Sequence, residues 1–95
     1  MQMPKVSQCQ VTRCAYNLNN TCHAQAITIG DDTHPMCDTF CGTCAKVQDA
    51  STVAAVGACK VEVCSFNEGL ECQAPGISVG MKGKEPDCLT FRPRQ

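Results

Sequence analysis

Residues 9–40 read CQVTRCAYNLNNTCHAQAITIGDDTHPMCDTF, and residues 59–91 return to the same frame with CKVEVCSFNEGLECQAPGISVGMKGKEPDCLTF. Both segments have the spacing Cys-x4-Cys-x7-Cys, followed by a fourth cysteine after fourteen residues in the first copy and fifteen in the second. A repeated set of four thiols is typical of a metal site or a disulfide framework. The chain therefore contains two copies of one small unit, and the cysteines organise its fold.

Each unit is too small to be held together by an apolar core alone. Chains below about 40 residues rarely bury enough apolar surface to fold by themselves. The chain contains only three Phe, one Tyr and no Trp. A structural zinc site contributes about 10–16 kcal/mol and a disulfide about 2–4 kcal/mol. We therefore expect the thiols to supply what the core lacks.

The eight matched cysteines are the candidate ligands. They are Cys9, Cys14, Cys22 and Cys37 in the first unit, and Cys59, Cys64, Cys72 and Cys88 in the second. Four thiolates suit tetrahedral zinc, and iron uses the same geometry. Two disulfides within each unit would use the same residues, and free or reactive thiols are a third alternative. Residues 1–8 lack a signal-peptide pattern, which favours a reduced, cytoplasmic chain and hence two Zn²⁺ ions per chain.

Cys41 and Cys44 form a Cys-x-x-Cys pair with no counterpart in the second unit. Such a pair can act as a redox dithiol. The βαβ setting of thioredoxin is missing here, so spare thiols or auxiliary metal ligands are the simpler interpretation.

The two histidines do not belong to the repeat. His23 and His34 align with Gln73 and Glu85, so the common site works without them. We expect both histidines at the surface.

Alternating apolar residues predict the strands. One strand leads into the first thiol of each unit, a second covers residues 27–29 and 77–79 and ends at Gly30 and Gly80, and a third closes each unit at residues 37–40 and 88–91. The core rings are expected to be Tyr16, Phe40, Phe66 and Phe91.

These elements predict small β-rich metal-binding or disulfide-rich modules, formed by tandem duplication of a short three-stranded antiparallel unit. The first module covers residues 5–40 and the second covers residues 58–92. Residues 41–57 form a linker that carries the extra cysteine pair and is either a short helix or mobile. We expect the arginines in the tail, residues 92–94, to be solvated.

Charge excludes several classes of function. The formal net charge is −1, with basic and acidic residues balanced in both halves. The chain therefore has no basic face for nucleic acid and no polybasic segment for a membrane. No acid/base pair, nucleophilic triad or phosphate loop is present, so we expect a monomer that is not an enzyme and that binds an unidentified protein partner.

Both units resemble the bacterial cysteine-rich domain of unknown function 1540, which often occurs in tandem. The resemblance rests on a Cys-x-Val-x-x-Cys start, an aromatic-Asn step, an Ile-x-Val/Ile strand and a Cys-x-Thr-Phe close. In the first unit these residues are Cys9, Val11, Cys14, Tyr16, Asn17, Cys22, Ala24, Ile27, Ile29, Cys37, Thr39 and Phe40. In the second unit they are Cys59, Val61, Cys64, Phe66, Asn67, Cys72, Ala74, Ile77, Val79, Cys88, Thr90 and Phe91. The resemblance implies a bacterial, cytoplasmic or spore-associated protein with metal binding and no known activity, and it does not extend to Cys41 and Cys44.

The sequence thus predicts a non-enzymatic, zinc-binding tandem-repeat protein that serves as an interaction or structural module. One alternative is a thiol-based metal buffer or redox sensor that uses Cys41 and Cys44. The other is a disulfide-framed extracellular or spore-coat protein.

Overall fold

The computed structural model describes residues 3–30, 34–48 and 50–94, and all regular secondary structure within them is β. The first unit contributes β1 Lys5–Cys9, β2 Asn17–Leu18, β3 Thr21–Cys22 and β4 Ala26–Ile29. The second unit contributes β5 Ala55–Cys59, β6 Asn67–Glu68, β7 Glu71–Cys72, β8 Gly76–Lys82 and β9 Glu85–Cys88. The predicted small β-rich class is confirmed.

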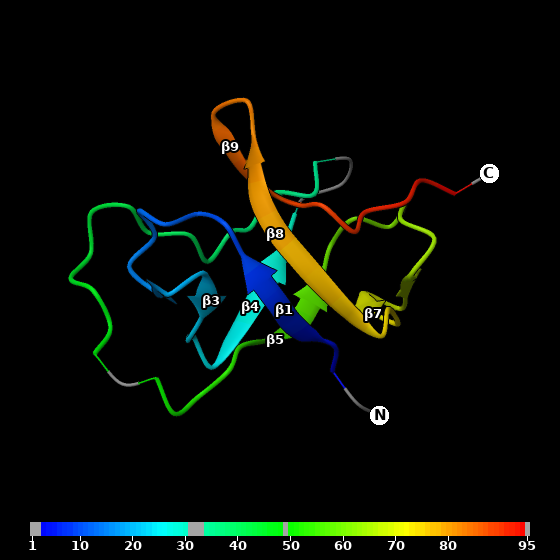
Figure 1. Cartoon of the computed structure of the whole chain (residues 1–95). Helices are drawn as coiled ribbons and strands as arrows, with labels where there is room; N and C mark the ends of the chain where they lie inside the picture. The colour runs from blue at the N-terminus through cyan, green and yellow to red at the C-terminus, as the bar shows by residue number, and fades with distance from the viewer. Residues whose placement is uncertain (1–2, 31–33, 49, 95) are drawn as a thin grey trace.

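Five of these strands form one mixed sheet in the order β4-β5-β1-β8-β9, which runs through the middle of the molecule (Figure 1). β1 and β5 are antiparallel neighbours at its centre. β1 also pairs in parallel with β8, and β5 pairs in parallel with β4. The first strand of each unit thus pairs with the isoleucine strand of the other unit.

The prediction of a self-contained three-stranded antiparallel module is therefore wrong. The apolar alternation identified β4 and β8 as strands, but alternation with a period of two does not indicate which strand lies beside them. Pairing across the units lets both copies share one core, which neither copy is large enough to build alone. In that core Val6 pairs with Ile77, Val56 pairs with Ile27, and all four side chains are at most 2% exposed.

The aromatic side chains pack at the edge of this core and are partly buried. The guanidinium carbon of Arg13 lies 5.3 Å from the centre of the Phe40 ring, and that of Arg92 lies 5.5 Å from the centre of the Phe66 ring. Phe40 and Phe66 therefore each carry a guanidinium over the ring, which is a cation–π arrangement.

A two-residue turn joins β2 to β3 and another joins β6 to β7. The turn residues have positive φ: 55° and 62° at Asn19 and Asn20, and 60° and 68° at Gly69 and Leu70. Two consecutive positive φ values match the right-handed twist of a tight hairpin, and Asn and Gly adopt them with little strain. The turns dock onto the sheet, since Cys9 N–H donates to Asn20 O at 3.0 Å and Cys59 N–H donates to Leu70 O at 2.9 Å.

Two predicted strand boundaries need correction. Gly30 does follow β4, but Gly80 lies inside β8, which continues to Lys82 and reverses at Gly83. The predicted closing strands at residues 37–40 and 88–91 are turns after their first cysteine, because Phe40 N–H bonds Cys37 O and Phe91 N–H bonds Cys88 O, both at 3.3 Å. The segment between Gly30 and Cys37 lies partly outside the described residues.

The helix considered for the linker is absent from the described residues, and β5 begins at Ala55, inside the range predicted as linker. Ala54 and Val56 are buried at a spacing of two, which suits a strand. Ala54 N–H donates to Cys22 O at 3.0 Å and Val56 N–H donates to Pro4 O at 2.8 Å. Tertiary hydrogen bonds thus override a weak helical pattern.

Candidate metal centre

The four matched cysteines of the first unit border one cavity. Cys9 ends β1, Cys22 ends β3, Cys14 lies in the turn between them, and Cys37 follows β4, where it forms an isolated bridge with Ile29. All four are buried, unpaired thiols. The cavity has a volume of about 20 Å³ and is also walled by Tyr16 and Phe40.

The second unit repeats this arrangement. Cys59, Cys72 and Cys88 end β5, β7 and β9. Together with Cys64 they border a second cavity of about 20 Å³. A cavity of this size holds about one atom-sized occupant and is far below the ~300 Å³ of a typical small-molecule pocket. Each quartet therefore borders a space with room for one small occupant.

Each cavity is completed by the other unit. Val79 and Pro86 line the first cavity, and Ile29 and Pro35 line the second. These apolar side chains reduce the contact of the sulfurs with water, which strengthens electrostatic interactions inside the cavity.

Backbone N–H groups point at four of the sulfurs. In the first unit Cys22 accepts from Ala24, and Cys37 accepts from Thr39 and Phe40. In the second unit Cys72 accepts from Ala74, and Cys88 accepts from Thr90 and Phe91. Hydrogen bonds to the ionised form favour it, so these contacts prepare the sulfurs to become thiolates.

Burial acts in the opposite direction and dominates. Desolvation raises the pKa of Cys37 from its ordinary value of 9.0 to about 11, and it does the same to Cys88. Desolvation also raises the pKa of Cys22 and of Cys72, and the charges of neighbouring cysteines add to the effect. Four thiolates therefore do not coexist here at neutral pH unless a cation balances them.

The donors fit a soft divalent cation chemically. Within residues 3–30, 34–48 and 50–94, no three His, Cys, Asp or Glu side chains have the spacing of a closed metal site. The cysteines of each quartet nevertheless share one cavity wall and lie close enough for their charges to interact. The sulfurs are therefore grouped around each cavity without having the spacing of metal ligands.

A buried asparagine anchors each quartet. Asn17 Nδ2 donates to Cys9 O at 2.8 Å, and Asn67 Nδ2 donates to Cys59 O at 2.7 Å. The Oδ1 atoms accept from the turn residues Asn20 and Leu70, both at 3.3 Å. The Asn of the aromatic-Asn step therefore links the tight turn of each unit to the strand that ends at the first cysteine.

A cation clamps the turn that follows the first thiol of each unit, and sequence reasoning missed it. Lys46 Nζ donates to the carbonyls of Thr12, Cys14 and Asn17 at 2.7, 3.1 and 2.8 Å. Arg94 donates from Nε to Glu62 O at 2.9 Å and from its guanidinium to Asn67 O.

Arg92 and Arg94 are exposed, as expected for the tail, but Arg94 is also anchored to these backbone carbonyls. The two cations share no sequence spacing that could reveal their equivalence, since Lys46 lies six residues after Phe40 and Arg94 three after Phe91.

The histidines and the nearby acids lie outside the two cavities. His23 Nδ1 is 2.7 Å from Thr52 O, and His34 Nδ1 is 3.2 Å from Glu85 Oε2.

Hydrogen bonds with Asp87 and then His34 lower the pKa of Glu85. Burial, followed by the hydrogen bond to Glu85, raises the pKa of Asp87 to about 6, and Asp87 Oδ1 has no hydrogen-bond partner among the described residues.

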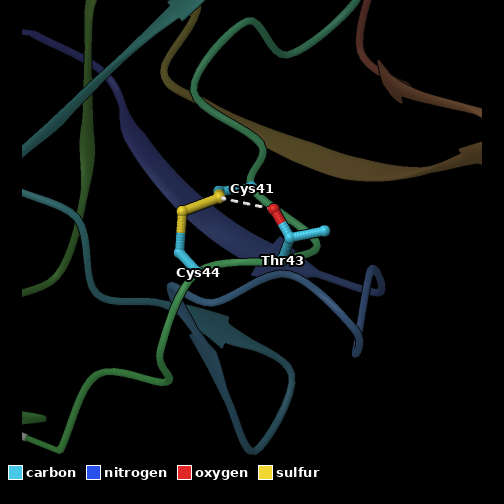
Figure 2. The surroundings of a disulfide bond; sticks show 3 residues. All are labelled: Cys41, Thr43 and Cys44. Atoms are coloured by element: carbon cyan, nitrogen blue, oxygen red, sulfur yellow. Dashed lines mark hydrogen bonds between the residues drawn. A yellow bond between two sulfur atoms is a disulfide. The ribbon is translucent and has the colours of Figure 1, made fainter.

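Cys41 and Cys44 are joined by a disulfide with a Cα–Cα distance of 5.7 Å. Figure 2 shows this bond with the Thr43 hydroxyl beside it, 4.0 Å from Cys41 Sγ. Cys44 is exposed and Cys41 is partly buried. The loop they close contacts the first unit, because Ala15 N–H donates to Cys41 O at 2.7 Å.

The family model described as Domain of Unknown Function (DUF1540) matches residues 8–44 and 58–91. The chain belongs to this family. The two matched segments coincide with the two cysteine quartets, so the DUF1540 unit is the repeat itself, and the first match also includes Cys41 and Cys44. No curated protein and no solved structure matches the chain.

None of the described residues belongs to a helix that is both long and apolar enough to cross a bilayer.

Proposed function

We propose that the chain is a non-enzymatic metal-binding protein in which each DUF1540 unit holds one Zn²⁺ ion on its four matched cysteines. The observation that carries this proposal is the gathering of each quartet around its own ion-sized apolar cavity. Backbone N–H groups directed at the sulfurs support it further. Iron is the alternative ion, because four thiolates bind it with the same geometry.

The ion would have a structural role and would hold the chain segments of one unit together. A zinc ion with four protein ligands has no open position for water or substrate, so it closes a fold and activates nothing. Four thiolates around a divalent ion add −2 per site to a chain of formal charge −1. The loaded protein is therefore acidic, which disfavours nucleic acid as a partner.

The same proposal assigns the protein to a reducing compartment, the bacterial cytoplasm, with spore association as a variant of it. All eight matched cysteines lie among the described residues and are unpaired. This supports metal binding over the disulfide-framed alternative. The outer surface, in a monomeric chain, is left for a protein partner.

Zinc content and fold are the direct test. We expect two zinc ions per chain by native mass spectrometry and loss of the β circular dichroism signal when a strong chelator removes them. Replacing Cys14 and Cys64 by serine should abolish tight binding at both sites. Replacing Cys41 and Cys44 by serine is the matched control and should leave two ions bound.

A chain that folds without metal and takes up no zinc would contradict the proposal. A visible thiolate-to-metal absorption band in the purified protein would identify iron in place of colourless zinc.

The disulfide supports a second candidate function, a thiol-based redox sensor or metal buffer centred on Cys41 and Cys44. A sensor should lose metal under mild oxidant, and a buffer should take up more than two ions. Both responses should disappear in the Cys41→Ser, Cys44→Ser variant. Identical metal retention in this variant and the native chain, under oxidant and reductant alike, would rule out the sensor.

A further inference from the structure

The fourth cysteines of the two units are held by each other's loops. Cys37 N–H donates to Pro86 O at 2.8 Å, and Cys88 N–H donates to Pro35 O at 2.7 Å. Between these two bonds Met36 pairs with Asp87 in an isolated antiparallel bridge. Residues 35–37 and 86–88 thus form one reciprocal junction, and neither fourth cysteine is positioned by its own unit alone.

The first cysteines are held across the units as well. Cys9 lies opposite Val79 in the β1–β8 pair, and Cys59 lies opposite Ile29 in the β5–β4 pair. The residues that follow continue the pairing, since Gln10 N–H donates to Val79 O and Lys60 N–H donates to Ile29 O, both at 2.8 Å. Each quartet therefore has its first and fourth cysteine on backbone that is hydrogen-bonded to the other unit.

From this arrangement we infer that the two metal sites are coupled, so that an ion bound at one site raises the affinity of the other. The inference rests on the proposed function, because it concerns ions held by the two quartets. It adds a regulatory property, which is that the two DUF1540 units load and release metal as a pair.

The physical reason is the cost of ordering the chain. Binding an ion requires the first and fourth cysteines of that quartet to be fixed, which requires the shared sheet and the junction to be formed. The ion that arrives first offsets this ordering cost. The second ion then meets backbone that is already in place, and binding to an ordered site is tighter. Linkage makes the effect reciprocal between the sites.

The expected size follows from ordinary site–site coupling, which corresponds to about 5- to 150-fold in affinity. Units with separate sheets, joined only by a linker, would bind metal independently.

The experiment measures zinc affinity in chelator-buffered solution, with native mass spectrometry to count ions. Three full-length chains are compared. They are the native sequence, a variant with Cys14→Ser and Cys22→Ser, and a variant with Cys64→Ser and Cys72→Ser. The substituted cysteines are the second and third of each quartet, so the thiols on β1, on β5 and at the junction stay intact.

Coupling predicts that the product of the two binding constants of the native chain exceeds the product of the two single-site constants by about 5- to 150-fold. Equal products overturn the inference and leave the proposed function standing. Failure of the native chain to bind zinc overturns both.

If a variant binds no zinc, coupling is tested instead by titrating the native chain with zinc. With one zinc ion supplied per chain, independent equal sites leave about half of the chains singly loaded. Coupling between sites of equal intrinsic affinity keeps this fraction well below half, and for such sites a fraction at or above half overturns the inference.

Discussion

At the residue scale, burial and hydrogen bonding have opposite effects on the pKa of the thiols in the candidate site. Cys37 and Cys88 accept two backbone N–H bonds each, yet desolvation outweighs them and raises the pKa of both thiols to about 11. The folded state therefore favours the protonated form of each thiol, and ionisation of the thiol lowers the stability of the fold. The metal-free protein and the metal-loaded protein should therefore respond to pH in opposite directions.

We predict that the metal-free, reduced protein is destabilised at alkaline pH. The folded-state pKa of Cys37 and Cys88, about 11, lies above the ordinary 9.0, so the folded state binds protons more tightly than the unfolded state. Stability from these groups is complete below pH 9 and is lost as the pH rises through 11. The measurement is the free energy of unfolding by denaturant as a function of pH, with chelator and reductant present.

The control for this prediction is the Cys37→Ala, Cys88→Ala variant, in which the alkaline loss should be much smaller. The zinc-loaded native protein should instead weaken on acidification, because protons compete with the ion for thiolates. An unfolding free energy for the metal-free native chain that stays constant across the alkaline range would contradict the assignment.

The second prediction at this scale concerns Lys46, whose ammonium group bonds three backbone carbonyls around Cys14. We expect Lys46→Met to lower the free energy of unfolding by about 1 kcal/mol, since hydrogen bonds to charged groups contribute more than neutral ones but this one is largely exposed. Lys46→Arg should restore part of the loss. Lys60→Met, at an exposed position, is the matched control and should change little in the same denaturant titration.

At the element scale, the two tight hairpins of the repeat differ in the residues that occupy equivalent positive φ positions. Asn20 in the first unit has φ 62° and Leu70 in the second has φ 68°. Asn tolerates this region, whereas a leucine there brings its Cβ close to backbone. Leu70 is 48% exposed, so its side chain gains little from packing in return.

We therefore predict that Leu70→Asn stabilises the protein by about 0.5–1 kcal/mol, and that Asn20→Leu destabilises it by a similar amount. The readout is the midpoint of chemical unfolding of the metal-loaded protein, with each hairpin serving as the control for the other. A loss of stability in Leu70→Asn would show that the Leu70 side chain packs usefully, which its exposure argues against.

At the scale of the whole molecule, the duplicated units behave as two halves of one sheet. β1 and β5 lie at the centre, and each is flanked by a strand from the opposite unit (Figure 1). The units are joined through these strands and through the junction at residues 35–37 and 86–88, so we expect them to stay together without the covalent linker.

A cut in the linker tests this directly. We predict that a protease site inserted between Ala50 and Ser51, once cleaved, yields two fragments that still co-elute on size exclusion and retain their metal. The uncut form of the same variant is the reference for elution and metal content. Separation of the fragments under native conditions would mean that the cross-unit pairing is too weak to hold the halves.

Much of the candidate site was predictable because cysteine spacing is a local and repeated signal. The eight matched cysteines fall into the two groups that the repeat predicted, and β1, β4, β5 and β8 occupy the alternating apolar segments. The clamps formed by Lys46 and Arg94 were not predictable, since their partners are backbone carbonyls about thirty residues earlier and their spacing differs between the units. The strand into Cys59 was predicted, but its first residues were assigned to the linker, because an Ala- and Val-rich segment suits helix and strand alike.

The thiol spacing and the apolar alternation are properties of neighbouring residues, so they could be read from the chain directly as a duplicated, cysteine-rich β protein. The exchange of strand partners between the duplicates, and the completion of each cavity by the other unit, are visible only in the folded chain. The reason is that a strand's alternation specifies which face is buried and leaves open which strand lies beside it. That choice depends on the shared core, to which residues from both ends of the chain contribute.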